Sequence, residues 1–311
     1  MRPGYCNLIW LVVIIISVPL NTLASASAVD TCLLEQIQQA DDNMTIGWLR
    51  RQCATAITPE KHLLKETSRD KRLLIPYKRN YLAIGAMRND DGSNPFSGDT
   101  TDIKFEFGVK YRVFRDDRYK FLRALKFGYA QKSWWDIAEE SLPFAESNYN
   151  PELFLDFDGQ LLGKDVNYQL GVEHESNGRG GLLSRSWNRA YVQGEINLSE
   201  YISLGLKLWE AVEVSDENKD ITDYLGNARF NANFRYKDKA SLNLSAIKGN
   251  RVDRISYQLD FMYNLVSLVN ADLFLTYYNG YGEALISYNQ KTESIRGGLV
   301  ISYDDWPDIL F

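Results

Sequence analysis

From residue 80 onward, the chain alternates apolar and polar residues in segments of about ten residues. Successive side chains of a strand point to opposite faces, so each such segment predicts a strand with one apolar and one polar face. In one of them every second residue is apolar: Ile255, Tyr257, Leu259, Phe261 and Tyr263. Twelve segments of this kind are predicted, at residues 80–87, 102–114, 121–135, 150–158, 165–177, 184–198, 202–212, 226–236, 240–248, 254–265, 270–283 and 293–304.

The connections between these segments differ in length in a regular way. The long ones are residues 88–101, 136–149, 213–225 and 284–292, and the short ones are 115–120, 159–164, 199–201, 237–239 and 266–269. Outer-membrane barrels combine an even number of antiparallel strands with short periplasmic turns and longer extracellular loops. The pattern therefore predicts an all-β fold, a 12-stranded antiparallel transmembrane β-barrel, over residues 76–311.

A soluble β-sandwich is the alternative fold, because its half-buried strands alternate in the same way. Two features favour the barrel. The polar faces are rich in charged and amide side chains, as a wet or salt-bridged lumen requires. Tyr and Trp occur near strand ends on the apolar faces, where an interfacial girdle would lie.

The residues before the barrel have a different character. Arg2 precedes an apolar run at residues 8–18, and small residues at 24–28 offer A-x-A cleavage patterns. Residues 1–28 are therefore predicted to be a signal peptide, cleaved after Ala26 or Ala28. A membrane anchor is the alternative, but the run is shorter than the roughly 20 apolar residues that a spanning helix needs. Residues 29–75 are predicted to be a periplasmic, partly helical segment, in which Cys32 and Cys53 would form a disulfide in an oxidising compartment.

Composition excludes several classes of function. The chain has 311 residues, with 35 Lys and Arg against 41 Asp and Glu, a formal net charge of −6. There is thus no basic excess with which to neutralise phosphates, and nucleic acid is not expected as a partner. Three cysteines and two histidines are too few for a Cys/His zinc site.

The candidate chemistry lies in one hairpin, at residues 172–191. Counting by twos from Val166 places His174 and Ser176 on the apolar, outward face, and counting back from Leu198 places Asn188 on the same face. A histidine and a hydroxyl facing lipid are costly unless they pair or take part in chemistry. Ser176 would be the nucleophile, His174 the general base, and Asn188 the group that orients the imidazole. The alternative is that these residues begin and end a polar loop.

The hairpin resembles the signature of bacterial outer-membrane phospholipase A, a resemblance carried by His174-Glu175-Ser176-Asn177-Gly178-Arg179 and Ser184-Arg185-Ser186-Trp187-Asn188-Arg189. Further blocks along most of the mature chain are similar to the same family: Pro76-Tyr77 with Asn80-Tyr81-Leu82, Gln131-Lys132-Ser133-Trp134-Trp135, Asn148-Tyr149-Asn150-Pro151-Glu152-Leu153-Phe154-Leu155, and Gly280-Tyr281-Gly282-Glu283 with Tyr288-Asn289.

The resemblance implies a function and a set of site residues. Members of the family hydrolyse sn-1 and sn-2 acyl esters of phospholipids and lysophospholipids, with phospholipase A1 and A2 activity, and are active as calcium-dependent homodimers. Carried over by motif, His174, Ser176 and Asn188 are the triad, and Gly178 offers its N–H to the oxyanion. One calcium ion per monomer would be bound by the Arg179 carbonyl, the Ser184 hydroxyl and, from the partner, a Ser141 carbonyl.

The chain departs from the family pattern in two places. The segment between Trp135 and Pro143 is about two residues shorter, and residues 180–183, Gly-Gly-Leu-Leu, are more apolar than the usual polar turn. The first difference bears on Ser141 and the second on the geometry of the calcium site.

Gln131 is a candidate dimer contact. Parity turns this residue outward into lipid, where an amide without partners costs several kcal/mol, so a second subunit would satisfy it. A side chain that reaches up to the membrane surface is the alternative.

With both termini in the periplasm, the active site would face the cell surface of the bacterial outer membrane. The expected partners are therefore phospholipid substrate, a second copy of the chain and the membrane. The rival class of function is a non-enzymatic outer-membrane channel or structural barrel, which needs no polar cluster facing lipid.

Overall fold

The computed structural model describes residues 73–96, 101–114, 124–137, 144–237, 239–265 and 271–301. By its contacts the chain divides into two compact units, residues 1–72 and 73–311, and the second contains every described residue. The predicted signal peptide, all but the last three residues of the 29–75 segment, the Cys32–Cys53 pair and Ser141 lie outside the described residues. In the described part, no helix has the length and apolar content needed to cross a bilayer.

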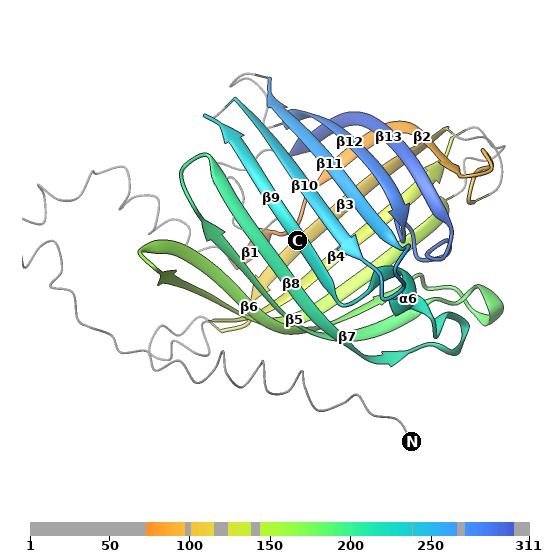
Figure 1. The fold of residues 1–311 in the computed structure, drawn as a ribbon, viewed down its shortest axis with the longest axis horizontal. Helices are drawn as coiled ribbons and strands as arrows, with labels where there is room; N and C mark the ends of the chain where they lie inside the picture. Colours follow the sequence, from red (N-terminus) through yellow and green to blue (C-terminus); the bar gives the residue numbers. More distant parts are fainter. Residues whose placement is uncertain are drawn as a thin grey trace, which may run out of the picture. The chain divides into compact units, whose positions relative to one another are not determined.

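Twelve antiparallel strands form a closed barrel, as the alternation predicted (Figure 1). Each strand pairs with its neighbours in sequence, and β2 pairs with both β3 and β13, which closes the ring. The strands are β2 (Tyr81–Asn89), β3 (Thr101–Arg112), β4 (Leu125–Asp136), β5 (Phe144–Leu161), β6 (Lys164–Ser176), β7 (Ser186–Asn197), β8 (Ile202–Val214), β9 (Ala228–Tyr236), β10 (Ala240–Lys248), β11 (Ile255–Asn264), β12 (Ala271–Tyr281) and β13 (Lys291–Ile301).

The barrel is apolar outside and polar inside. Along β11, Ile255, Tyr257, Phe261 and Tyr263 are exposed on the outer face, whereas Ser256 and Asp260 are buried in the lumen. Charged lumenal side chains pair with one another: Arg296 contacts Asp102 and Glu283, and Lys104 also contacts Glu283. Charges removed from bulk water need such partners.

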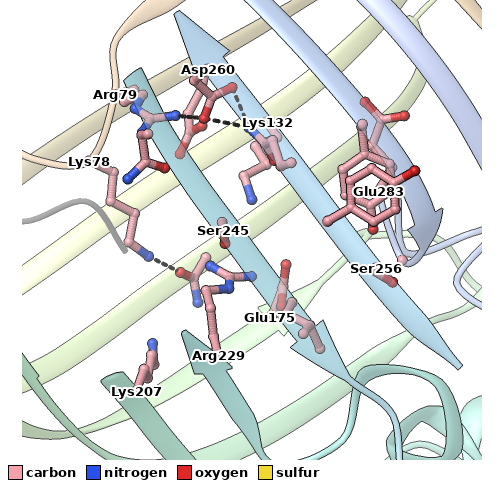
Figure 2. Close-up of a pocket in the computed structure, with 18 of the residues that line it drawn as sticks. Lys78, Arg79, Lys132, Glu175, Lys207, Arg229, Ser245, Ser256, Asp260 and Glu283 are labelled. Atoms are coloured by element: carbon pink, nitrogen blue, oxygen red, sulfur yellow. Dashed lines mark hydrogen bonds and ion pairs between the residues drawn. The ribbon is translucent and has the colours of Figure 1, made fainter. Parts of the chain in front are cut away.

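The lumen is largely filled by these side chains. A polar cavity of about 130 Å³ remains, lined by charged and amide residues. Arg79, Lys132, Glu175, Arg229 and Asp260 are among those residues (Figure 2). Sites for small organic ligands are typically 300–1,000 Å³. The cavity therefore has room for a few waters rather than for a lipid.

Apolar and aromatic side chains close the lumen at the end where β8 and β9 are joined. The short helix α6 (Ile221–Leu225) lies there (Figure 1), and its Ile221 and Leu225 pack in one buried cluster with Trp187, Leu285 and Tyr288. The Tyr288 hydroxyl donates a hydrogen bond to Asp220. Burial and this contact raise the pKa of Tyr288, which keeps the hydroxyl protonated as a donor.

Two elements differ from the prediction. A short strand, β1 (Leu74–Pro76), pairs with β3 beyond the point where β2 begins, and residues 77–80 between them form no strand. The strand predicted at residues 150–158 begins at Phe144, so the predicted long connection 136–149 shrinks to 137–143. A bulge lies at the start of this strand, because Trp134 and Trp135 pair with Glu146 and Phe144 and leave one residue between them unpaired. Residues 146–149 continue the regular register of β5.

Candidate active site

The predicted triad lies on the β6–β7 hairpin. Across the strand pair His174 faces Asn188, and Ser176 faces Ser186. The His174 Nδ1 atom lies 2.7 Å from the Asn188 Oδ1 atom. An amide oxygen only accepts hydrogen bonds, so this contact places the imidazole proton on Nδ1 and leaves Nε2 free to accept.

Neighbouring residues of β6 show which face the triad occupies. Glu173 forms ion pairs with Arg189 and Lys207, and Glu175 pairs with Arg189, all in the lumen. His174 and Ser176 alternate with these two carboxylates, so their side chains lie on the outer face of the barrel.

Ser176 follows His174 by two residues on that face, a Cα spacing of about 6.7 Å along a strand. Its side chain is half-buried. Among the described residues, the Ser176 hydroxyl makes no hydrogen bond. The structure thus connects His174 to Asn188 by a hydrogen bond and places Ser176 next to His174 on the same face, with the Ser176 hydroxyl not hydrogen-bonded within the described residues.

The loop between the two strands is organised by Asn177, which is almost completely buried. Its Oδ1 accepts the backbone N–H groups of Arg179, at 3.3 Å, and Arg185, at 3.0 Å, and its Nδ2 donates to the Leu183 carbonyl at 2.9 Å. Three hydrogen bonds from one side chain therefore hold the two ends of the loop together.

Gly178 is required by its backbone conformation. Its φ is +66°, and a Cβ at this position would lie 2.9 Å from the Tyr149 ring. Any other residue would be strained and crowded here. Among the described residues the Gly178 N–H makes no hydrogen bond, so this donor is available near the triad.

The predicted calcium ligands lie on the same loop. Within the described ranges, neither the Arg179 carbonyl nor the Ser184 hydroxyl takes part in a hydrogen bond. No group of three or more His, Cys, Asp or Glu side chains that could bind a metal ion occurs in this part of the chain. The donors that fit calcium here are therefore neutral oxygens, a carbonyl and a hydroxyl, which are hard ligands of the type this ion prefers.

Two carboxylates of this region were not predicted from the sequence. Glu146 of β5, which is fully buried, accepts from the Arg179 Nε at 3.0 Å and from the Ile286 N–H at 3.2 Å, and so links the loop to the residues that close the lumen. Glu213 of β8 accepts from the Asn188 Nδ2 at 2.7 Å. Glu213 lies beyond a bulge in β8, where counting by twos gives the wrong face. Glu146 keeps the parity of the buried Asn148 and Glu152, but it fell in the predicted connection 136–149.

The premise for Gln131 as an unsatisfied amide is wrong. Its Oε1 accepts from the Tyr129 hydroxyl and its Nε2 donates to Ser133, each at 3.0 Å. All three side chains belong to β4, so the amide has partners within its own strand. A contact between subunits at Gln131 stays a prediction.

Comparisons with known proteins relate this chain to one family. The family model described as Phospholipase A1 matches residues 58–301. The Phospholipase A1 proteins of Klebsiella pneumoniae and Escherichia coli K12 are each 32% identical to this chain, over 74% of it and 82% and 81% of their own lengths.

Solved structures give the same result. An active-site mutant of outer membrane phospholipase A from Escherichia coli superposes with a TM-score of 0.67 at 28% identity, over 75% of this chain and 93% of that one. The calcium-bound dimer of the Salmonella typhi outer membrane phospholipase superposes with a TM-score of 0.66 at 27% identity, over 74% and 92%. The 12-stranded barrel, its outward-facing polar hairpin and these matches lead to one conclusion: this chain belongs to the Phospholipase A1 family of the outer membrane.

Proposed function

We propose that this protein is a calcium-dependent outer-membrane phospholipase that hydrolyses the sn-1 and sn-2 acyl esters of phospholipids and lysophospholipids. The observation that carries the proposal is the 2.7 Å contact between His174 Nδ1 and Asn188 Oδ1, beside Ser176, on the lipid-facing wall. On that wall a bilayer lipid reaches the hydroxyl without leaving the membrane.

The first half of the reaction is acyl transfer to the enzyme. His174 Nε2 takes the proton from the Ser176 hydroxyl, and the serine oxygen attacks the ester carbonyl. Asn188 holds the ring with Nε2 toward the serine and stabilises the imidazolium that forms. The Gly178 N–H donates to the oxyanion, and His174 then gives its proton to the departing glycerol oxygen.

Water completes the cycle. His174 takes a proton from a water molecule, which attacks the acyl-serine, and the fatty acid leaves as Ser176 regains its proton. The Arg179 carbonyl, the Ser184 hydroxyl and a carbonyl from Ser141 of the partner subunit would hold the calcium ion. When bound, this ion supplies positive charge near the developing oxyanion.

Dimerisation follows from the same set of ligands, because a calcium site that takes one donor from the partner is complete only in the dimer. The calcium-bound dimer of the Salmonella typhi relative supports this assembly. We further propose that one ion binds per monomer and that the active site faces the cell surface, since the loop 177–185 lies at the end of the barrel opposite the short β7–β8 turn.

A passive channel, the rival function, fits the structure less well. The lumen is crossed by ion pairs such as Arg296 with Asp102 and is closed at one end by α6 and Tyr288. A channel also gives no reason for a bonded histidine and asparagine on the lipid face.

The test is hydrolysis of phospholipid by the purified protein in mixed micelles, with calcium and with a chelator. We expect fatty acid release with calcium and almost none after chelation. Ser176→Ala should lower the rate by more than about a thousandfold, as removal of a triad member does in serine hydrolases. Full activity in Ser176→Ala would overturn the triad, and full activity in the chelator would overturn the calcium requirement.

A further inference from the structure

Glu213 on β8 lies directly behind the triad. Its Oε2 accepts a hydrogen bond from the Asn188 Nδ2 at 2.7 Å, while the Oδ1 of the same amide meets His174. Serine, histidine, asparagine and glutamate thus follow one another across three adjacent strands, β6, β7 and β8. We propose, on the basis of the function proposed above, that Glu213 is a positioning residue that fixes the orientation of Asn188.

A register shift brings Glu213 to this place. From Ile202 to Glu210 the residues of β8 alternate regularly, so that Ser203, Lys207 and Trp209 are buried in the lumen. Continued without interruption, the alternation would turn Glu213 inward as well. Instead Asn188 pairs with Glu213 and Arg189 pairs with Ala211, so Val212 is an extra residue. The bulge turns both Val212 and Glu213 outward, where both are exposed.

The chemistry of the two groups explains why a carboxylate is needed. An asparagine amide can rotate by half a turn, which exchanges its oxygen and its nitrogen. Only the orientation with Oδ1 toward His174 lets the amide accept from the imidazole. A carboxylate accepts but does not donate, so Glu213 forms its hydrogen bond with Nδ2 alone and holds the amide in this orientation.

The location of Glu213 adds a second argument. A carboxylate on the outer wall of a barrel is costly in the membrane unless it has a partner. Here its partner is the Asn188 amide of the triad, and two successive hydrogen bonds connect the negative charge of Glu213 to the imidazole of His174. That charge stabilises the imidazolium formed when Ser176 loses its proton, without contact between Glu213 and the substrate.

The experiment compares two variants of Glu213 with a matched control. Glu213→Ala removes the acceptor and should lower kcat about tenfold, the factor that about 1.4 kcal/mol represents, with KM for a short-chain ester unchanged. Glu213→Gln keeps an acceptor oxygen but loses the charge and gains a donor, so it should recover only part of that loss. The control is Glu210→Ala, an exposed carboxylate on the same strand opposite Ala190, and it should behave like the wild type.

A double-mutant cycle separates positioning from general destabilisation. In an Asn188→Ala background, Glu213→Ala should cause no further loss, because the amide that it orients is gone. An equal loss in both backgrounds, or wild-type kcat in Glu213→Ala, would overturn the inference. Ser176→Ala serves as the reference: if Ser176→Ala remains active, the proposed function itself is wrong, whereas an inactive Ser176→Ala beside a fully active Glu213→Ala removes Glu213 alone.

Discussion

At the scale of single residues, three amides with different tasks organise the hairpin. The Asn188 amide contacts His174 through its oxygen and donates to Glu213 through its nitrogen. The Asn177 amide forms hydrogen bonds with the loop backbone through both its oxygen and its nitrogen. Asn150, on the neighbouring strand, donates to the His174 carbonyl at 2.8 Å. Each amide thus provides hydrogen-bond partners for backbone or side-chain groups of the hairpin.

Asn177→Ala should loosen the loop that carries the proposed calcium ligands. The change removes two acceptor contacts and one donor contact from a buried side chain, a cost of about 1–3 kcal/mol. We expect faster hydrogen exchange at residues 178–184 and a calcium titration midpoint shifted to higher concentration. Gln160→Ala, at the exposed end of β5, is the control and should change neither. Unchanged exchange at 178–184 would contradict the role given to Asn177.

At the scale of elements, β-bulges limit how far the alternation of the sequence predicts the face on which a side chain lies. Ten of the twelve strands alternate without interruption, and for these the period of two gave both the strand and its faces. The bond between His174 and Asn188 was predictable because the two residues face each other across one regular hairpin. Glu213 was not predictable, because one extra residue in β8 reverses the parity beyond it. Glu146 was missed because it lies in the part of β5 that was predicted to be a connection.

The short strand β1 was missed for a different reason. It has only three residues and ends in Pro76, too short a segment to show alternation. The calcium site was predictable only by resemblance, because its donors include backbone carbonyls, which every residue possesses.

Glu146→Ala should weaken the junction between the loop, β5 and the residues that close the lumen. The buried carboxylate accepts from Asn148, Arg179 and Ile286, and its loss leaves three donors without their acceptor. We expect the free energy of unfolding to fall by about 2–3 kcal/mol, measured by urea titration in lipid vesicles. Glu146→Gln should cost less, since one acceptor oxygen stays. A loss no larger than that of the exposed Glu210→Ala would contradict this assignment.

At the scale of the whole molecule, the barrel reverses the usual distribution of polarity in a soluble protein, with apolar side chains outside and charged side chains inside. Its large apolar residues, such as Leu206, Phe230 and Leu275, are exposed on the outer wall, and its ion pairs are inside. This arrangement suits a hydrocarbon surrounding, where the outer wall has no hydrogen bonds to offer or receive. The stability of the fold therefore depends on a connected polar interior.

Arg296→Met tests that dependence. Arg296 is completely buried and contacts both Asp102 and Glu283, so its removal leaves two carboxylates close together in the lumen. Breaking a buried pair in this way costs about 3–5 kcal/mol. We expect a loss of that size in urea unfolding and partial recovery when Glu283→Gln is added. If the double variant is no more stable than Arg296→Met alone, the uncompensated charge is not the cause.

The outward placement of His174 and Ser176 determines which measure of substrate concentration governs the reaction rate. In the proposed reaction, the lipid reaches the site by lateral diffusion within the membrane, and the fatty acid is released into the same membrane. The quantity that sets the turnover rate is then the mole fraction of cleavable lipid around the wall, a two-dimensional density, rather than its amount per volume of solution. Diluting that lipid with an inert amphiphile will lower the turnover rate. Adding buffer at a constant surface composition will leave the turnover rate per enzyme molecule unchanged.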